Sequence, residues 1–195
     1  QLAQAMDPAA TPDAAAYPNA DLAVNVGDLF IYNSLENGTD LFDHGIAGEL
    51  SFGGVTINRP IVYNPPVLGL VLPATYQDSW MDTTMWQLSL SGNDVGITQV
   101  DSVRFIRHIN RMDMIDGHGI LHLPNDTFPD VLRLKRTEHT RDSLFAKLPF
   151  IGWTNDLSAF GVPSVFVDSS FAFQFWAAGR DLPVLQFTVD ANDTV

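Results

Sequence analysis

Apolar and polar residues alternate in short runs along most of this chain, the pattern of β-strands that turn one face to a core and the other to water. Trp86–Leu90 alternates strictly, and in Val131–Arg136 the leucines and the basic residues fall on opposite faces. Turn-forming residues such as Asn37-Gly38 and Ser91–Asp94 separate the runs. About ten strand candidates follow one another in this way from residue 20 onward.

Apolar residues spaced by three and four, which mark an amphipathic helix, do not extend over any long segment. Only Asp142–Leu148 is compatible with about one helical turn. The pattern therefore predicts an all-β fold, and its two-faced alternation favours antiparallel strands. We expect a two-sheet sandwich, jelly-roll-like, that makes residues 20–195 a single domain.

Residues 1–19 have a different composition, dominated by Ala, Pro and Asp. Pro8, Pro12 and Pro18 interrupt any long helix, and the segment has too little bulky apolar surface to fold alone. It is either a solvated leader or an extended arm that docks on another subunit. In the second case the contact is made by its apolar residues and those of the strand after it: Leu2, Ala5, Met6, Tyr17, Leu22, Val24 and Val26.

The composition of the chain shows that it can fold and excludes several kinds of partner and site. The chain has 195 residues, 46% of them hydrophobic, and 13 phenylalanines, so it can fill a core. Its formal net charge is −13 with only 10 Lys and Arg, which disfavours nucleic acid and an anionic membrane surface as partners. The absence of cysteine excludes disulfides, a Cys-ligated zinc and a thiol nucleophile. No apolar run reaches the roughly 18 residues of a membrane-spanning helix, so we expect no membrane span.

Histidines and acids occur near one another in sequence, but the strand pattern keeps them apart. His118 and His122 are four residues apart, which on a strand is roughly 13 Å, too far to share a metal ion. Asp43-His44 and Glu138-His139 are adjacent, and adjacent strand residues face opposite sides. No Gly-x-Ser-x-Gly elbow supplies a serine nucleophile. We therefore predict no enzyme and no cofactor; a hydrolase with a dispersed triad is the weaker alternative.

Pairs of carboxylates are plentiful because 23 residues are acidic. None of the pairs fits the calcium-loop pattern, so we predict no metal site beyond an adventitious calcium ion. Examples of such pairs are Asp78 with Asp82, Asp113 with Asp116, and Asp190 with Asp193.

The tryptophans suggest a second function. Trp86 and Trp176 lie within strand patterns and are expected in the core. Trp153 follows Ile151-Gly152 and is the candidate exposed aromatic residue. An exposed tryptophan with carboxylates nearby suits a carbohydrate- or ligand-binding module, which would make glycans or a small ligand the partner.

One long block, Ile115–Lys135, has a characteristic arrangement of glycines, prolines and strand residues. Asp116–Gly119 and Leu123–Asp126 are each predicted to be a turn, because glycine accepts positive φ and Pro, Asn and Asp favour turns. Two further blocks share this mixture of turn and strand signals, Tyr63–Asp82 and Phe173–Leu185.

These three blocks resemble segments of secreted Bacteroidota proteins that carry a type IX secretion sorting domain. His118 stands where that pattern has Tyr, and Asn125-Asp126 replaces a Gly-containing pair. The resemblance spans most of residues 19–189 and implies export to the cell surface, with no established activity to carry over. It also implies that Gln1 and Val195 are mature ends left by processing.

The resemblance has two further implications. The O-glycosylation signal of such proteins resembles Asp-Ser/Thr-aliphatic, which makes the candidate sites Ser102, Ser143, Thr194 and, less strictly, Thr83. We therefore expect a secreted structural or adhesive surface glycoprotein, whose arm joins copies of itself into a filament or binds other surface proteins. The carbohydrate- or ligand-binding module is the alternative.

Overall fold

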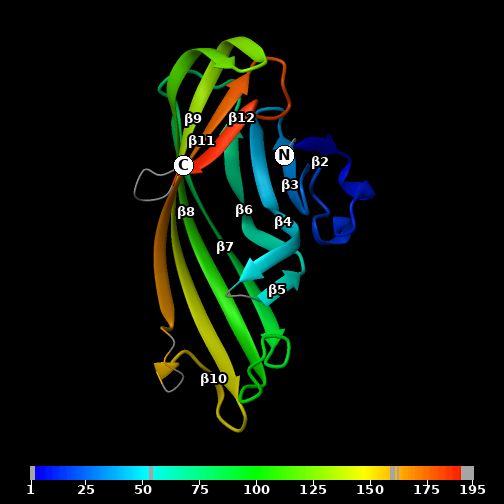
Figure 1. The fold of residues 1–195 in the computed structure, drawn as a ribbon, viewed down its shortest axis with the longest axis vertical. Helices are drawn as coiled ribbons and strands as arrows, with labels where there is room; N and C mark the ends of the chain where they lie inside the picture. Colours follow the sequence, from blue (N-terminus) through cyan, green and yellow to red (C-terminus); the bar gives the residue numbers. More distant parts are fainter. Residues whose placement is uncertain (1–2, 53–54, 159–160, 162, 190–195) are drawn as a thin grey trace.

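The computed structural model describes residues 3–52, 55–158, 161 and 163–189, and nearly all their regular structure is β-strand (Figure 1). The all-β prediction is confirmed. Two 3-10 helices, η1 (Pro8–Ala10) and η2 (Ala14–Ala16), lie near the N-terminus. The strands are β1 (Gln4–Met6), β2 (Leu22–Val26), β3 (Leu29–Glu36), β4 (Asp40–Phe52), β5 (Val55–Asn58), β6 (Ile61–Val71), β7 (Ser79–Ser91), β8 (Ser102–Leu123), β9 (Asp126–Leu148), β10 (Gly152–Thr154), β11 (Val165–Ala177) and β12 (Leu185–Val189).

All of these strands belong to one sheet, and every neighbouring pair is antiparallel. The order is β1-β2-β3-β4-β6-β7-β8-β9-β11-β12, with β5 paired to β4 and β10 to β9. Figure 1 shows that the sheet is strongly curled, with β2–β4 on one side and the long strands β8, β9 and β11 on the other. The prediction of two stacked sheets is therefore wrong for the described residues. Alternating strands bury an apolar face equally well by stacking or by curling, and the local pattern does not distinguish the two.

The concave side of the curled sheet holds most of the core, and a separate cluster lies under the N-terminal segment on the other face of β2–β4. Ile57 of β5 packs with Trp86 of β7, and Leu70 of β6 packs with Leu134 of β9. Neither pair of strands is adjacent in the sheet. Side chains from separate strands therefore meet because the sheet bends around them.

Gly45 of β4 allows the closest approach in this bend. Its φ is 139°, and a Cβ there would collide with the backbone oxygen of Ile61 and lie 2.9 Å from the ring of Tyr17. The pairing of β4 with β6 also changes register between Asp43 and Gly45. A glycine at this position is what lets β6 and the N-terminal segment both pack against β4.

The N-terminal segment differs from the expected extended arm, because residues 3–19 fold back on their own sheet. Gln4–Met6 pair with β2, and Tyr17 is buried and stacks on Tyr32 with ring centroids 3.9 Å apart. The Tyr17 hydroxyl donates to the carbonyls of Ile46 (2.6 Å) and Ile61 (3.1 Å). The segment is mostly Ala and Pro, but the single large aromatic residue Tyr17 attaches it to the sheet.

Two local predictions are also corrected in the long hairpin of β8 and β9. Asp116–Gly119 is not a chain reversal: it lies within β8, where the pairing with β9 shifts register at two places. Asp142–Leu148 is strand in β9 and not a helical turn. The turn predicted at Leu123–Asp126 is confirmed and joins the two strands.

Candidate ligand-binding site

An apolar trough lies on the concave side of the sheet. Its volume is about 680 Å³, within the roughly 300–1,000 Å³ range of small-molecule sites. It runs from β5 across β7, β8 and β9 to the start of β11. Its apolar lining includes Ile57, Trp86, Leu88, Phe105, Leu144 and Phe166.

The trough is a part of the core that stays open to solvent. Trp86 and Leu88 in its wall are buried and belong to the same cluster as Ile57. Ile97 and Phe166 also line it, yet both are exposed. Apolar side chains that remain exposed beside a packed core form a concave surface suited to an apolar ligand.

Three charged residues interrupt this apolar lining: the ion pair of Arg107 with Asp142, and the exposed Asp168. The guanidinium of Arg107 donates from Nε and Nη2 to the two carboxylate oxygens of Asp142, each at 2.6 Å. This hydrogen bonding to Asp142 raises the pKa of Arg107, so the side chain stays charged. The guanidinium also lies 5.6 Å from the ring of Trp86 and 5.7 Å from that of Phe105. Its Nη1 makes no hydrogen bond to the described residues and can donate to a polar group of a ligand.

A buried charged cluster follows the Arg107–Asp142 pair along β8 and β9 on the concave side. Arg111 of β8 donates to Asp43 of β4 (2.5 Å) and to Glu138 of β9 (2.7 Å). Arg136 of β9 donates to both carboxylate oxygens of Asp113, at 2.9 and 3.1 Å, and Asp113 is fully buried. These pairs connect β4 to β8 and β9 across the curl.

The electrostatics of this cluster suit a structural role. Burial acts to lower the pKa of Arg111, but Asp43 and Glu138 outweigh it, so the pKa lies above its ordinary value. Burial raises the pKa of the neighbouring Tyr63 to about 12. An arginine held in its charged form and a tyrosine held in its neutral form do not exchange protons near neutral pH, so this cluster fixes strands in place.

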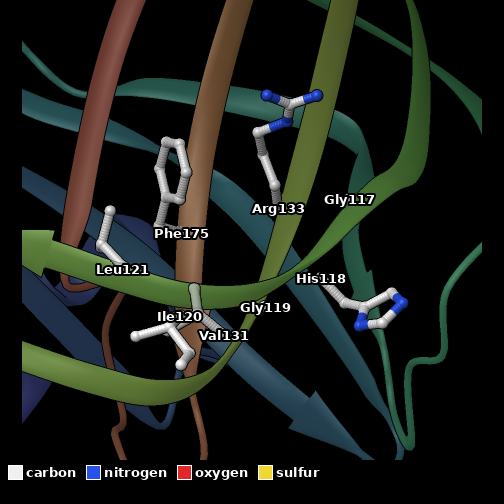
Figure 2. A pocket seen from close by; sticks show the side chains of 8 residues that line it. All are labelled: Gly117, His118, Gly119, Ile120, Leu121, Val131, Arg133 and Phe175. Carbon is white, nitrogen blue, oxygen red and sulfur yellow. The ribbon is translucent and has the colours of Figure 1, made fainter.

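Figure 2 shows a smaller pocket of about 220 Å³ at the upper end of β8. Arg133 and Phe175 project to the same side from neighbouring strands, and His118 points away from them. Arg133 is already paired with Asp116 through Nε (2.8 Å) and Nη2 (3.3 Å). Because this pocket is smaller than the roughly 300–1,000 Å³ of small-molecule sites and the trough is not, we regard the trough as the stronger candidate site.

The histidines and acids that are adjacent in sequence have separate partners in the structure. His44 contacts Ser34 (2.8 Å) while Asp43 pairs with Arg111, and His139 contacts Ser169 (2.8 Å) while Glu138 pairs with Arg111. Each adjacent His and acid therefore face different partners, as predicted. In the described part of the chain no carboxylate hydrogen-bonds to either histidine.

The other predicted pairs also separate. His118 lies against Tyr76, with ring centroids 5.1 Å apart, and His122 contacts Thr127. Asp78 accepts hydrogen bonds from Thr75, and Asp82 accepts one from the backbone of Leu68. Asp190 and Asp193 lie outside the described residues. Among the residues that are described, no group of three or more His, Asp or Glu is placed to hold a metal ion.

Trp86 is in the core as expected, Trp176 is half-buried against a core cluster, and Trp153 of β10 is 40% exposed. The guanidinium of Arg104 lies 4.1 Å from the centroid of the Trp153 ring, so one face of that ring is already occupied. Trp153 is not a lining residue of the trough. The two candidate ligand sites are therefore distinct.

The residues predicted to form the intersubunit arm contact their own chain, and the predicted glycosylation sites differ in exposure. Ala5 pairs with Val24, β2 lies between β1 and β3, and Tyr17 is buried, so these residues contact their own chain. Met6 packs against the cluster of Tyr17. The remaining assigned residues are Leu22 and Val26 at the ends of β2, half-buried Ser102 and Ser143, exposed Thr83, and Leu2 and Thr194, which lie outside the described residues.

The trough was missed in the sequence because its residues look like ordinary core residues. Val103 and Phe105 occupy the inward phase of β8, and Arg107 follows them in that same phase. The sequence does contain one signal of the trough. Arg107 is a charged residue at a strand position whose neighbours on the same face are apolar, and such a residue marks a place where the inward face meets solvent or a partner.

Within the described residues the helices are two three-residue 3-10 turns, and none is long and apolar enough to cross a membrane. Comparison with known proteins gives no match to any family model, any curated protein or any solved structure.

Proposed function

We propose that this chain is a ligand-binding domain whose trough holds a molecule with an apolar body and one polar group. The observation that carries the proposal is the open apolar lining around the Arg107–Asp142 pair. Apolar contacts with Phe105, Leu144 and Phe166 would supply affinity, and Arg107 Nη1 would fix the orientation of the polar group.

A fluorescent acyl probe, dansyl-undecanoic acid, tests this proposal by titration of the folded protein. The double variant Ile97→Ser/Phe166→Ser removes two exposed lining side chains and should weaken binding about tenfold or more. Leu72→Ser is the matched control, because Leu72 is also an exposed apolar residue but lies outside the trough. Absence of binding to the wild type, or equal loss in both variants, would overturn the proposal.

A second candidate function, self-association as a structural or adhesive subunit, rests on β11 and not on the N-terminal segment. Val165–Ser170 pair with β9, while β12 pairs with Phe171–Phe175. In the described residues the first half of β11 therefore has a free edge, and Val165 and Val167 beside it are exposed. Such an edge can accept a strand from another copy.

Light scattering after size exclusion tests this second candidate. If β11 edges pair, the wild type will run above its monomer mass and Val167→Lys will run as a monomer, because a charge on the edge strand opposes pairing. A wild type that stays monomeric at high concentration would contradict it.

We further propose that the chain works outside the cell, on the support of its resemblance to exported Bacteroidota surface proteins. Of the candidate glycosylation sites, Thr83 is the exposed one within the described residues, whereas Ser102 and Ser143 are half-buried. Intact-mass measurement of the protein from its native source should show added sugar, and peptide mapping should assign it to a peptide that contains one of these residues. An unmodified mass would remove the glycosylation proposal.

A further inference from the structure

The side of β8, β9 and β11 opposite the trough forms a continuous outer face. On β8 the ion pairs of Arg107, Arg111 and Asp113 lie on the concave side. Because strand residues alternate, Met112 and the residues in phase with it point outward. We define the outer face by Arg104, Met112, Lys135, Arg141, Lys147 and Val167.

Charge is segregated across the thickness of this part of the sheet. The acidic residues Asp113, Glu138, Asp142 and Asp168 are all in the inward phase. At the outward positions of residues 102–114, 135–147 and 165–175 there is no acidic residue. Although the net charge of the chain is −13, the Lys, Arg, Asp and Glu residues at these outward positions are all cations. The nearby Asp116 is paired with Arg133.

The cations of the outer face have no carboxylate partner among the described residues. Arg104, Lys135, Arg141 and Lys147 form no ion pair with the described residues. By contrast, Arg107, Arg111 and Arg136 on the concave side all have carboxylate partners. The carboxylates of this part of the sheet are paired with the inward cations, so the positive charges of the outward cations are not neutralised by ion pairs with the described residues.

Exposed apolar side chains lie among these cations. Val167 is 75% exposed, and Met112 is 47% exposed. Met81 of β7, the direct cross-strand partner of Met112, is 73% exposed. The Lys135 ammonium lies 5.6 Å from the ring of Phe171, whose side chain is half-buried on the same face.

We propose that the outer face docks on an anionic lipid bilayer. Cations are attracted to the negative headgroups, and the apolar side chains between them can enter the interface, the combination that peripheral membrane surfaces use. Two copies placed outer face to outer face would bring like charges together. Single-stranded nucleic acid is bound by stacking on aromatic rings, whereas the most exposed apolar residues here are Met81 and Val167, which do not stack.

The net negative charge does not prevent this docking. At physiological salt the screening length is about 8 Å, so charges farther from the bilayer contribute little. Asp113, Glu138, Asp142 and Asp168 lie on the concave side of the sheet and the bilayer would lie on the convex side. The electrostatic potential at the headgroups is therefore set by the cations of the outer face.

Vesicle co-sedimentation of the full chain tests the proposal, with vesicles of phosphatidylglycerol and phosphatidylcholine (1:1) against phosphatidylcholine alone. Lys135→Gln/Arg141→Gln should weaken binding to the anionic vesicles about 30-fold, since each cation near such a surface contributes roughly a factor of five. Arg59→Gln/Arg180→Gln is the matched control, because it changes the net charge equally and both residues are exposed but belong to none of β8, β9 and β11.

Binding by the wild type and the control, but not by Lys135→Gln/Arg141→Gln, supports the proposal. No binding of the wild type to anionic vesicles, or equal loss in both double variants, overturns it. A further variant, Met81→Ser/Met112→Ser, should lose vesicle binding but leave binding to single-stranded DNA unchanged. If the wild type binds DNA as tightly as it binds vesicles, and the methionine variant binds vesicles normally, the face recognises polyanions and the bilayer proposal is wrong.

Discussion

Two Arg–Asp pairs on the same two strands differ mainly in burial, and this difference decides their contribution to stability. Asp113 is fully buried beside Arg136, whereas the Arg133 partner of Asp116 is 43% exposed. Asp113→Ala leaves a guanidinium without its partner in a buried site, so the free energy of unfolding should fall by about 3–5 kcal/mol. Asp116→Ala should cost about 1 kcal/mol or less.

Urea unfolding of the two variants measures both values. Similar losses would show that burial does not set the strength of these pairs, and would contradict the structural role assigned to the cluster around Arg111.

The stability of the protein should depend on pH through His44. Burial lowers the pKa of His44 even though Glu36 and Asp43 act to raise it. Below the unfolded-state pKa of about 6.5, the unfolded chain therefore binds a proton that the folded chain does not, and stability falls as pH falls. Thermal unfolding between pH 7 and pH 5 should show this loss, and it should be smaller in His44→Gln. An identical pH dependence in the two proteins would exclude His44 as its source.

At the scale of elements, the N-terminal segment is attached to the sheet by Tyr17. Tyr17→Ala removes a buried ring that stacks on Tyr32, and should destabilise the protein by about 3–5 kcal/mol. Tyr17→Phe keeps the ring but leaves the carbonyls of Ile46 and Ile61 without their donor, for a loss of about 1–3 kcal/mol. Chemical denaturation measures both losses. Variants as stable as the wild type would instead indicate a segment free to reach another subunit.

The contact between β4 and β6 also permits a direct test. Gly45 and Gly38 both have positive φ, but a Cβ at Gly45 would collide with Ile61 while one at Gly38 has no atom within 4 Å. Gly38→Ala should therefore cost only the backbone strain of about 1–2 kcal/mol. Gly45→Ala adds the collision, so its midpoint of unfolding should be markedly lower. Equal midpoints would mean that β6 can move away from β4 without loss.

Alternation allowed the strands to be recognised one by one, but not the way they assemble. Trp86–Leu90 and Val131–Arg136 are strands as predicted, since period-two patterns depend only on neighbouring residues. Asp116–Gly119 was misread because glycine suits a bulge within a strand as well as a turn. The arm was misread because composition averages over a segment, whereas a single residue, Tyr17, holds it in place.

At the scale of the whole molecule, the candidate site depends on the curl, which no local pattern encodes. Ile57 and Phe166 are more than one hundred positions apart in the chain, and they line the same trough only because one sheet bends around. The outer face was hidden for a related reason: the total charge of −13 conceals the separation of cations from acids across β8 and β9.

The distribution of charge along the chain should make stability depend on salt. The first 58 residues contain no Lys or Arg, and the protein carries an excess of negative charge. Self-repulsion of that charge is screened by salt, so the melting temperature should rise between about 10 and 200 mM NaCl. Glu36→Gln/Glu49→Gln, at two exposed positions, should show a smaller rise. A melting temperature that falls with salt would mean that attractive ion pairs dominate over repulsion.

The connection of Asp43 to Arg111 also bears on how such a gene can recombine. One partner is encoded before residue 52 and the other after residue 102. A crossover between them that brought in an unrelated second half would leave the Asp43 carboxylate inside the sheet with no cation to meet it. We therefore expect chimeras of this sequence to fold only when the second half supplies a cation at the position of Arg111.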